Sequence, residues 1–280
     1  MSIGVGVELP PSTRFTDDSG SDQPWRSDWS EKSFEADRIR RLIAEITPSD
    51  EVRQGRRFGV HVLDGSDHHS DIGRFVEATV FMEYFKNNLD VMRAAYGPYD
   101  EHSTLLTVVD YEAQEPVGVV RVIEHSELDV ITLAEIQNPK YPWRAGLSMA
   151  DRWHEIGDDP EHTLDITTMA VMPEYKSGHA KDGASAALYS TCVIWSLAKD
   201  INTWVSIVDK KIHGDMQAWG EVWDDFEGAD WAPYMGSKAR KPVHLQLKPA
   251  LEKVRAVDEG IYALYTQSAG LEHQFVLPRI

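Results

Sequence analysis

Residues 164–190 read LDITTMAVMPEYKSGHAKDGASAALYS, and this stretch decides the fold. Its first part predicts a buried strand over residues 163–172, and residues 183–199 predict a helix. A loop that contains Lys176 and Gly178 lies between them. Such a junction presents backbone N–H groups and a helix N-terminus to an anion, usually a phosphate. We therefore expect an anion-binding strand–loop–helix unit in the middle of the fold.

The flanking sequence alternates between short strand patterns and helical patterns. Alternating apolar residues predict strands at residues 58–63, 104–110, 117–124, 163–172, 203–209 and 243–247. Apolar residues at helical spacing predict helices at residues 34–46, 71–87, 89–96, around 133, 149–156, 183–199, 213–223 and 250–265. This order favours an α/β sheet with helices on both faces, whose central strand–helix–strand unit contains a parallel pair.

Composition narrows the class of protein. The chain has 280 residues, of which 42% are hydrophobic, enough for one large core or two modest ones. Its formal charge of −18 argues against a nucleic-acid-binding surface and against a general role at anionic membranes. The single cysteine, Cys192, allows no intrachain disulfide and is most simply a small buried residue. With no signal-peptide pattern and no long apolar segment, we expect a cytoplasmic protein.

The N-terminal segment differs from the rest of the chain. Residues 1–32 are rich in Ser, Asp, Pro and Gly, which predicts an acidic, disordered extension. Trp25 and Trp29 are unusual in such a segment: either they fix it to the domain or to a partner, or they make casual surface contacts. Residues 33–56 are expected to form a helix and a linker, and residues 57–280 the main domain with a C-terminal helix.

The loop after the central strand resembles that of the GNAT superfamily of N-acyltransferases. In that family the loop reads Val-x-Pro followed by Arg/Gln-x-x-Gly-x-Gly/Ala, and its backbone amides hold the pyrophosphate of coenzyme A. Val171 and Pro173 match the first half, whereas the second half is stretched and lacks the Arg/Gln. The resemblance implies a GNAT-like mixed sheet with helices on both faces and a cofactor-binding loop. The implied binding residues are Val171, Lys176, Ser177, Gly178, His179, Gly183 and Ala184.

A narrower resemblance is to acyl-homoserine-lactone synthases and N-acyl amino acid synthases, over about residues 57–250. Their fourth strand carries Glu-x-Ser-Arg-Phe-x-Val, and other motifs are Gly-x-x-Arg, Tyr-Asp and Tyr-x-Gly-Ser followed by Pro. The corresponding residues here are Asp165, Thr167, Thr168, Met169 and Val171; Gly118 and Arg121; Tyr99 and Asp100; and Tyr234, Gly236, Ser237 and Pro242. Thr168 replaces the strand Arg, and of an Arg-Val-Phe motif only Val80 and Phe81 remain. These departures argue against a homoserine-lactone product and leave acyl transfer to another amine.

Aminolysis of a thioester requires a hydrogen-bond donor for the carbonyl oxygen, a base for the amine and an acid for the thiolate. The resemblance places the donor at a strand bulge, in the backbone N–H groups near Thr168, Met169 or Ala170. Strand alternation predicts that Asp165, Thr167 and Met169 share one face. Asp165 is then the candidate base, directly or through water. The alternative is that it only orders a nearby Arg or loop.

Two tyrosines are candidates for the acid. Tyr189 falls on a predicted helix and is more simply explained by packing, whereas Tyr234 lies in a Pro/Gly loop and either protonates the thiolate or lines a pocket. Arg121, on a strand rich in valine, either binds a carboxylate of the acceptor or pairs with Asp100 or Asp165. Asp100, Arg121 and Thr168 are therefore the candidate acceptor-binding residues.

Basic and histidine clusters leave further alternatives. A basic group near the C-terminal strands either meets coenzyme A phosphates or an acidic carrier protein, or forms a solvated rim; it comprises Lys210, Lys211, Lys238, Arg240 and Lys241. Histidines occur at 68, 69, 154 and 162, but without a His-Glu-x-x-His arrangement, so no metal site is expected.

The sequence thus predicts an N-acyltransferase that moves an acyl group from acyl-CoA or acyl-carrier protein to the amine of a small molecule. Medium or long acyl chains suit the resemblance better than acetyl. Two alternatives remain: a catalytically degenerate module that binds an acyl thioester or a protein, and an acyl-homoserine-lactone synthase.

Overall fold

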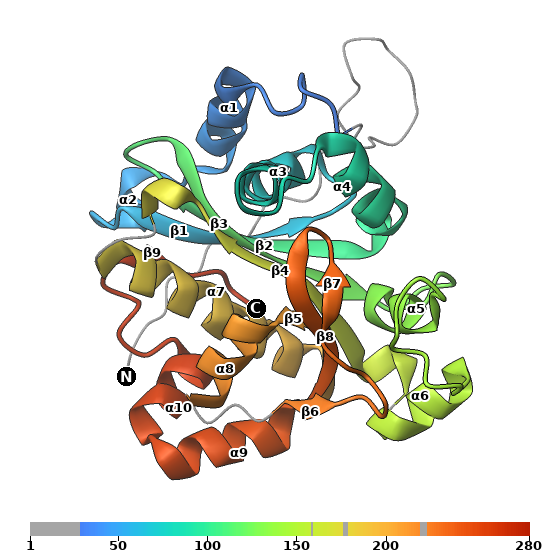
Figure 1. The fold of residues 1–280 in the computed structure, drawn as a ribbon. Helices are drawn as coiled ribbons and strands as arrows, with labels where there is room; N and C mark the ends of the chain where they lie inside the picture. The colour runs from blue at the N-terminus through green and yellow to red at the C-terminus, as the bar shows by residue number, and fades with distance from the viewer. Residues whose placement is uncertain (1–28, 158, 176–178, 219–222) are drawn as a thin grey trace.

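A mixed sheet runs through the part of the chain that the computed structural model describes, namely residues 29–157, 159–175, 179–218 and 223–280 (Figure 1). Its strands lie in the order β6-β8-β5-β4-β3-β2-β1-β9, and β7 pairs with β8. Neighbours are antiparallel except β4–β5 and β1–β9. The strands are β1 Phe58–Asp64, β2 Ser103–Asp110, β3 Glu115–Glu124, β4 Thr163–Val171, β5 Thr203–Asp209, β6 Asp224–Asp225, β7 Ala232–Tyr234, β8 Ser237–Gln246 and β9 Phe275–Val276.

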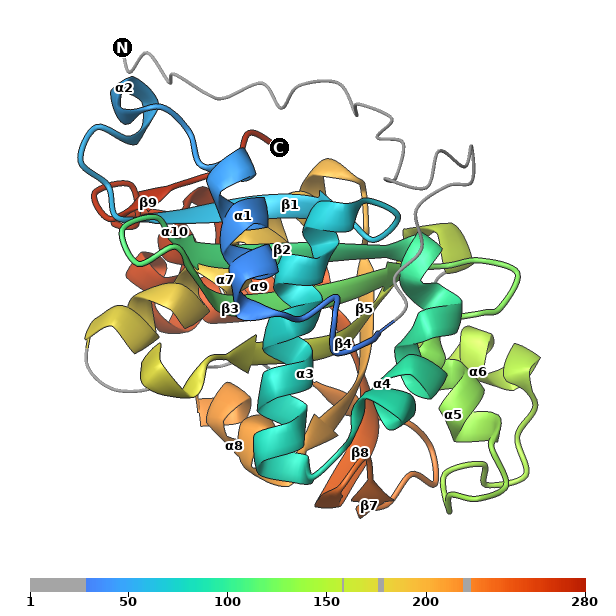
Figure 2. The same cartoon turned by 90° about the horizontal axis from the view of Figure 1, so that it is seen from above.

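Helices cover both faces of this sheet. The α-helices are α1 Ala36–Ile46, α2 Asp50–Arg53, α3 Asp71–Phe85, α4 Leu89–Tyr96, α5 Ile131–Gln137, α6 Met149–Ile156, α7 His179–Ala198, α8 Lys210–Ala218, α9 Leu247–Val257 and α10 Glu259–Gln267. Short 3-10 turns are η1 His68–Ser70, η2 Gly97–His102, η3 Pro160–His162 and η4 Pro173–Tyr175. Helices α1 and α3 lie on one face, and α7 and α9 lie on the other (Figure 2). The predicted α/β fold with a mixed sheet and a parallel central pair is confirmed.

Element bounds differ from the prediction where tertiary contacts set them. Helix α7 begins at His179 rather than Gly183, and α8 occupies Lys210–Ala218 rather than residues 213–223. The prediction of a single C-terminal helix is wrong, because α9 ends at Asp258. The Asp258 side chain accepts hydrogen bonds from the N–H groups of Gly260 and Ile261 and so caps a second helix, α10. The two- and three-residue strands β6, β7 and β9 are too short to show a period.

Trp29 fixes the start of the described chain to the domain. Its side chain is fully buried and stacks on Tyr96 of α4, with ring centroids 6.3 Å apart. Its indole N–H donates to Asp100 Oδ2 at 2.9 Å. Of the two alternatives for Trp29, fixing the N-terminal segment to the domain is therefore confirmed. Trp25 lies outside the described residues. Among the described residues no helix is both long and apolar enough to cross a bilayer.

An enclosed ion network joins α3, η2 and β3. The Arg121 guanidinium donates to both carboxylate oxygens of Glu77, at 2.7 to 3.2 Å, and to Asp100 Oδ1 and Ser103 Oγ, each at 2.9 Å. Arg74 Nε lies 3.1 Å from Asp100 Oδ1. Burial alone would lower the pKa of Arg121, but the charges of Glu77 and Asp100 outweigh it and raise that pKa. The two arginines and two carboxylates thus compensate one another inside the core.

Removing Arg121 should strongly destabilise the fold. We expect Arg121→Met to lower the free energy of unfolding by about 3–5 kcal/mol, because Glu77 and Asp100 would lose their cation in a buried position. Urea denaturation of the full chain measures the effect. In the control Arg40→Met, the lost partner is the exposed Asp37, so the urea midpoint should not move. Equal midpoints for the two variants would contradict a structural role for Arg121.

Candidate active site

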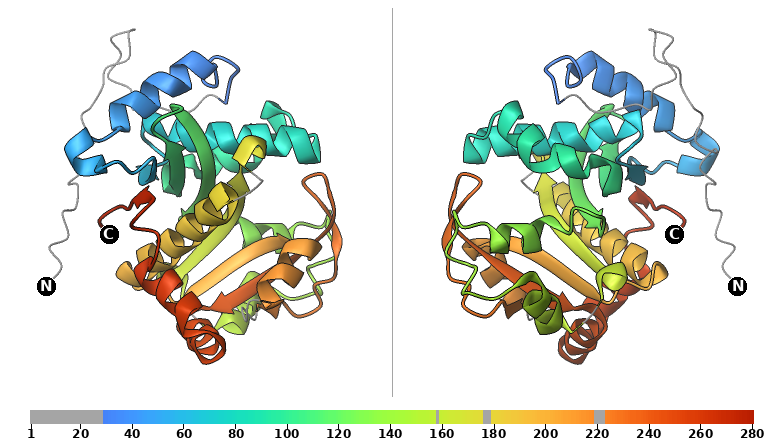
Figure 3. Two further views of the ribbon diagram at one scale, coloured as in Figure 1. Left: turned by 90° about the vertical axis from the view of Figure 1, so that its left-hand side faces the viewer. Right: turned by 90° about the vertical axis from the view of Figure 1, so that its right-hand side faces the viewer.

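The sheet splits between β4 and β5. These parallel strands pair only at Thr163–Thr203, Leu164–Trp204 and Asp165–Val205, although both strands continue beyond that point (Figure 3). Just past the last pair, the hydroxyl of Ser206 donates to the carbonyl oxygen of Ile166 at 2.6 Å. Diverging strands leave polar groups facing a crevice at their carboxyl ends, which is a common position for ligands in α/β sheets. The split is therefore a candidate ligand-binding position.

A β-bulge at Thr167 lies at the same point of β4. Ile166 pairs with Val122 of β3, but Thr168 pairs with the neighbouring Arg121, so Thr167 is an extra residue. One extra residue exchanges the two faces of a strand beyond it. The prediction that Asp165, Thr167 and Met169 share a face is therefore wrong for Met169, whose side chain is 42% exposed. The resemblance placed a bulge close to this position.

Asp165 is a buried carboxyl group at the head of the split. Its side chain is 0% exposed. Oδ2 accepts the backbone N–H of Thr132 at 2.6 Å, and Oδ1 accepts the Thr132 hydroxyl at 2.9 Å. Burial raises the pKa of Asp165 to about 7, although the Thr132 hydrogen bonds lower it. Asp165 therefore orders the first turn of α5 and also titrates near neutral pH, a property of groups at functional sites.

A small cavity is lined by Thr132, the hydrogen-bond partner of Asp165. Its volume is about 10 Å³, about enough for one water molecule. Thr167 Oγ1 and Arg240 Nε are buried and have no hydrogen-bond partner among the described residues. The cavity thus combines hydroxyl, phenol and guanidinium groups with apolar walls. It is lined by Tyr96, Ile131, Thr132, Thr167, Ile207, Tyr234 and Arg240.

The β7–β8 hairpin positions Tyr234 at this cavity. Met235 and Gly236 form its two-residue turn with φ of 47° and 78°, as a type I′ turn requires. A Cβ on Gly236 would lie 2.2 Å from the carbonyl oxygen of Phe85, so only glycine allows the turn to sit on the end of α3. Burial raises the pKa of Tyr234 further above 10, and its phenol therefore stays protonated at neutral pH.

Arg240 lies in the cavity wall rather than on a rim. Its side chain is 7% exposed, and its guanidinium carbon lies 4.7 Å from the ring centroid of Phe85, 5.7 Å from that of Phe81 and 6.0 Å from that of Tyr234. Aromatic faces stabilise a cation without using its N–H donors. The buried Arg240 can therefore still donate hydrogen bonds into the cavity.

The other basic residues near Arg240 do not form one surface with it. Lys241 is buried and pairs with Asp225 at 2.6 Å. Lys210 Nζ lies over the ring of Trp231, 5.9 Å from its centroid, and Lys238 is exposed. The single basic group that the sequence suggested is thus divided between the cavity, an ion pair and the surface.

Three predicted acceptor-binding side chains are enclosed by protein. Asp100 and Arg121 belong to the ion network, with exposed fractions of 7% and 0%. Thr168 is 3% exposed, and its hydroxyl lies 3.5 Å from that of Tyr96. Their polar groups face protein partners, and that they bind the acceptor stays a prediction. For Arg121, the alternative of pairing with Asp100 is confirmed.

The predicted cofactor loop is described only in part. Lys176, Ser177 and Gly178 lie outside the described residues. Because α7 begins at His179, Gly183 and Ala184 lie within the helix, where their N–H groups bond to the preceding turn. Ala184 is also fully buried.

The remaining predicted side chains have structural positions. Val171 packs half-buried against the core on the α7 face. Tyr189 packs against the rings of Trp204 and Tyr265, as its simpler explanation required. Cys192 is buried. Thr132 and Tyr96, which bring α5 and α4 to the cavity, carried no signal in the sequence, because only the tertiary fold places them there.

The chain has the fold of the GNAT acyltransferases. One similar solved structure is FeeM, an N-acyl amino acid synthase from uncultured soil microbes, with a TM-score of 0.51 and 12% identity over 73% of this chain and 98% of FeeM. Others are the acyl-homoserine lactone synthases BjaI, solved with SAM and isopentyl-CoA (TM-score 0.47, 12% identity, 81% of this chain and 96% of BjaI), and LasI (TM-score 0.45, 14% identity, 69% of this chain and 91% of LasI). No protein-family model matches the sequence, and a search of curated protein sequences finds no match.

The buried Asp165 should make stability depend on pH. Between about pH 4 and pH 7 the folded protein holds a proton on Asp165 that the unfolded chain has released, so the free energy of unfolding falls as pH rises through this window. We expect Asp165→Asn to remove about 3–4 kcal/mol of this fall. Urea denaturation at pH 4.5 and pH 8 measures it. Parallel pH profiles for the two proteins would show that Asp165 is ionised throughout.

Proposed function

We propose that this protein transfers an acyl group from a thioester, acyl-CoA or acyl-carrier protein, to the amine of a small molecule at the β4–β5 split. The observation that carries the proposal is Asp165, a carboxyl group with a pKa of about 7, linked by the Thr132 hydroxyl to a cavity beside the bulge. A general base works best when its pKa lies near the working pH. The fold shared with FeeM, an N-acyl amino acid synthase, supports the same class of reaction.

Each group around the cavity has a role in this proposal. The amine nitrogen attacks the thioester carbonyl carbon, so a C–N bond forms and the C–S bond breaks. The amine releases a proton to Thr132 Oγ1, whose own proton passes to Asp165 along their 2.9 Å hydrogen bond. Backbone N–H groups at the bulge, near Thr168 and Met169, donate to the carbonyl oxygen as its charge develops. Tyr234 gives its phenolic proton to the thiolate and regains one from solvent, and Asp165 releases the proton it gained to solvent.

The size of the cavity sets a condition on this mechanism. A volume of about 10 Å³ holds one water, so an acyl chain and an acceptor need side chains around it to move. The β7–β8 hairpin is one element whose displacement would widen the cavity, since Tyr234 and Arg240 both come from it. A buried cation with free donor capacity favours an acceptor that carries an anionic group, such as a carboxylate.

A second candidate is a module that binds an acyl thioester without turning it over. The observation in its favour is that both Asp165 oxygens accept hydrogen bonds from α5, which is also what a purely structural carboxyl group would do. Catalysis and binding alone predict different results when Asp165 is replaced.

The first test combines binding and turnover. Calorimetric titration with acetyl-, octanoyl- and palmitoyl-CoA should give saturable binding that tightens with chain length. Mass spectrometry should then detect an N-acyl product from an amine panel. Asp165→Asn should bind the same donor but form product about 1000-fold more slowly, since its amide cannot accept the proton. Asp200→Asn, an exposed control, should match the wild type. Tight donor binding with no product from any amine would instead favour the binding module.

Replacing Tyr234 tests the acid. We expect Tyr234→Phe to lower kcat by about 100-fold with little change in donor binding, because the ring still fills the cavity wall but cannot protonate the thiolate. Tyr141→Phe is the matched control: Tyr141 packs against Tyr234, with ring centroids 5.3 Å apart, yet does not line the cavity. With a donor whose thiol is a better leaving group, the loss of kcat caused by Tyr234→Phe should be smaller. A defect of the same size with both donors would exclude the acid role.

A further inference from the structure

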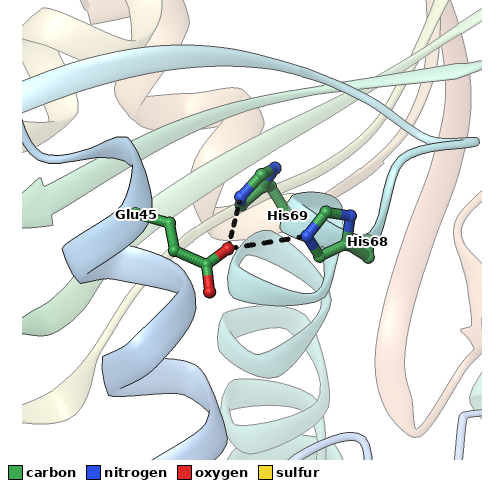
Figure 4. Close-up of side chains that lie close together, drawn as sticks. All are labelled: Glu45, His68 and His69. Carbon is green, nitrogen blue, oxygen red and sulfur yellow. Dashed lines mark hydrogen bonds and ion pairs between the residues drawn. The ribbon is translucent and has the colours of Figure 1, made fainter. Parts of the chain in front are cut away.

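Two adjacent histidines and a glutamate converge where α1 meets η1 (Figure 4). Glu45 Oε2 lies 3.1 Å from His69 Nε2 and 3.6 Å from His68 Nε2. The two imidazole rings are tilted by 36° to each other, with centroids 4.0 Å apart. One ligand atom from each of the three residues lies within 4.8 Å of the others. None of the three lines the cavity at the β4–β5 split, so this cluster is independent of the acyltransferase proposal.

Asp67 orients both rings from the opposite side. Its Oδ1 lies 2.8 Å from His69 Nδ1 and 3.4 Å from His68 Nδ1, and it also accepts the backbone N–H of His69 at 2.8 Å. With the Nδ1 atoms turned to Asp67, the Nε2 atoms face Glu45 (Figure 4). A carboxylate on the far nitrogen is the usual arrangement around a metal-binding histidine, because it fixes the tautomer and the ring direction.

The facing atoms are ones that a metal ion can join when His69 is neutral. A neutral His69 that donates its Nδ1 proton to Asp67 has a lone pair on Nε2, 3.1 Å from a Glu45 carboxylate oxygen. Neither atom then has a hydrogen to share, and His68 Nε2 faces the same oxygen. One cation between the three atoms would contact a ligand atom of each residue.

We propose that Glu45 Oε2, His68 Nε2 and His69 Nε2 bind a late first-row divalent cation, with Zn²⁺ as the probe, and that the ion ties α1 to the start of α3. Zinc bonds of about 2.0–2.1 Å place the ligands of a tetrahedron about 3.3 Å apart, and the distances of 3.1 and 3.6 Å lie on either side of that value. The histidines are 20% exposed, so the ion can enter from solvent and keep a water as its fourth ligand.

The sequence alone predicts no metal site at His68 and His69. The histidine pair has no second motif nearby, and Glu45 belongs to a different helix that only the fold brings close. Helix α1 packs on α3 through Ile39 and Ile43, and Arg38 pairs with Asp71 at 2.7 Å. An ion at the cluster would add a cross-link at the other end of α1.

Calorimetry of the chelator-treated full chain with Zn²⁺ tests the proposal. We expect one saturable site. Free Zn²⁺ at about 100 times the dissociation constant should raise the thermal unfolding midpoint by about 5 °C. His68→Ala, His69→Ala and Glu45→Gln should each weaken binding by about tenfold or more. Asp67→Asn, which keeps an acceptor for η1, should weaken it by about tenfold through ring orientation alone.

His162→Ala is the matched control. His162 also lies beside two carboxylates, Asp159 and Asp200, but they approach opposite ring nitrogens and cannot share one ion with it. Zinc binding should be unchanged in that variant. Hydrogen exchange should show zinc slowing the amides of α1 in the wild type but not in Glu45→Gln. No saturable binding, binding that survives all three ligand substitutions, or unchanged exchange in α1 would overturn the proposal.

Discussion

The rest of the structure depends on one buried charge, the guanidinium of Arg121 in the middle of β3. An unpaired cation in that position would strongly destabilise the fold. A carboxylate therefore comes to it from each of two elements, Glu77 from α3 and Asp100 from η2. The same guanidinium lies over the rings of Tyr96, 5.1 Å from its centroid, and Trp29, 5.6 Å from its centroid. Satisfying one arginine therefore fixes how α3, α4 and the start of the described chain pack on the sheet.

That constraint also shapes the candidate site. Arg121 faces Thr168 across the β3–β4 ladder, and the register changes immediately beyond this pair. On its other edge, the pairing of β4 with β5 ends at Asp165. The strand is thus irregular on both edges over a few residues, while the ion network and Tyr96 hold the surrounding elements. A rigid frame around a locally irregular strand is a suitable base for a site whose groups must keep their geometry.

The sequence predicts what depends on local periodicity and fails where register or long-range contact decides. The strands and most helices follow from alternation and spacing, and the Tyr-x-Gly-Ser motif correctly marks the turn beside Tyr234. Alternation predicts the wrong face for Met169, because a bulge depends on pairing with β3, which no single strand reveals. The positions of Arg240 and Glu45 next to their partners depend on contacts between distant elements. The sequence alone therefore puts Arg240 in a basic group and Glu45 on a predicted helix, and shows neither set of partners.

Asp165 differs in one respect from the other buried carboxylates. Glu77 and Asp100 face arginines, whereas the described residues offer Asp165 the hydrogen-bond donors of Thr132 and no cation, and burial therefore raises its pKa to about 7. For holding α5 alone, an asparagine would serve equally well, since its amide oxygen accepts the same N–H and the threonine hydroxyl can turn to accept. A carboxyl group here makes the fold less stable at neutral pH than an amide would. Such a local conflict with stability is expected at functional sites, and it favours a proton-transfer role for Asp165 over a purely structural one.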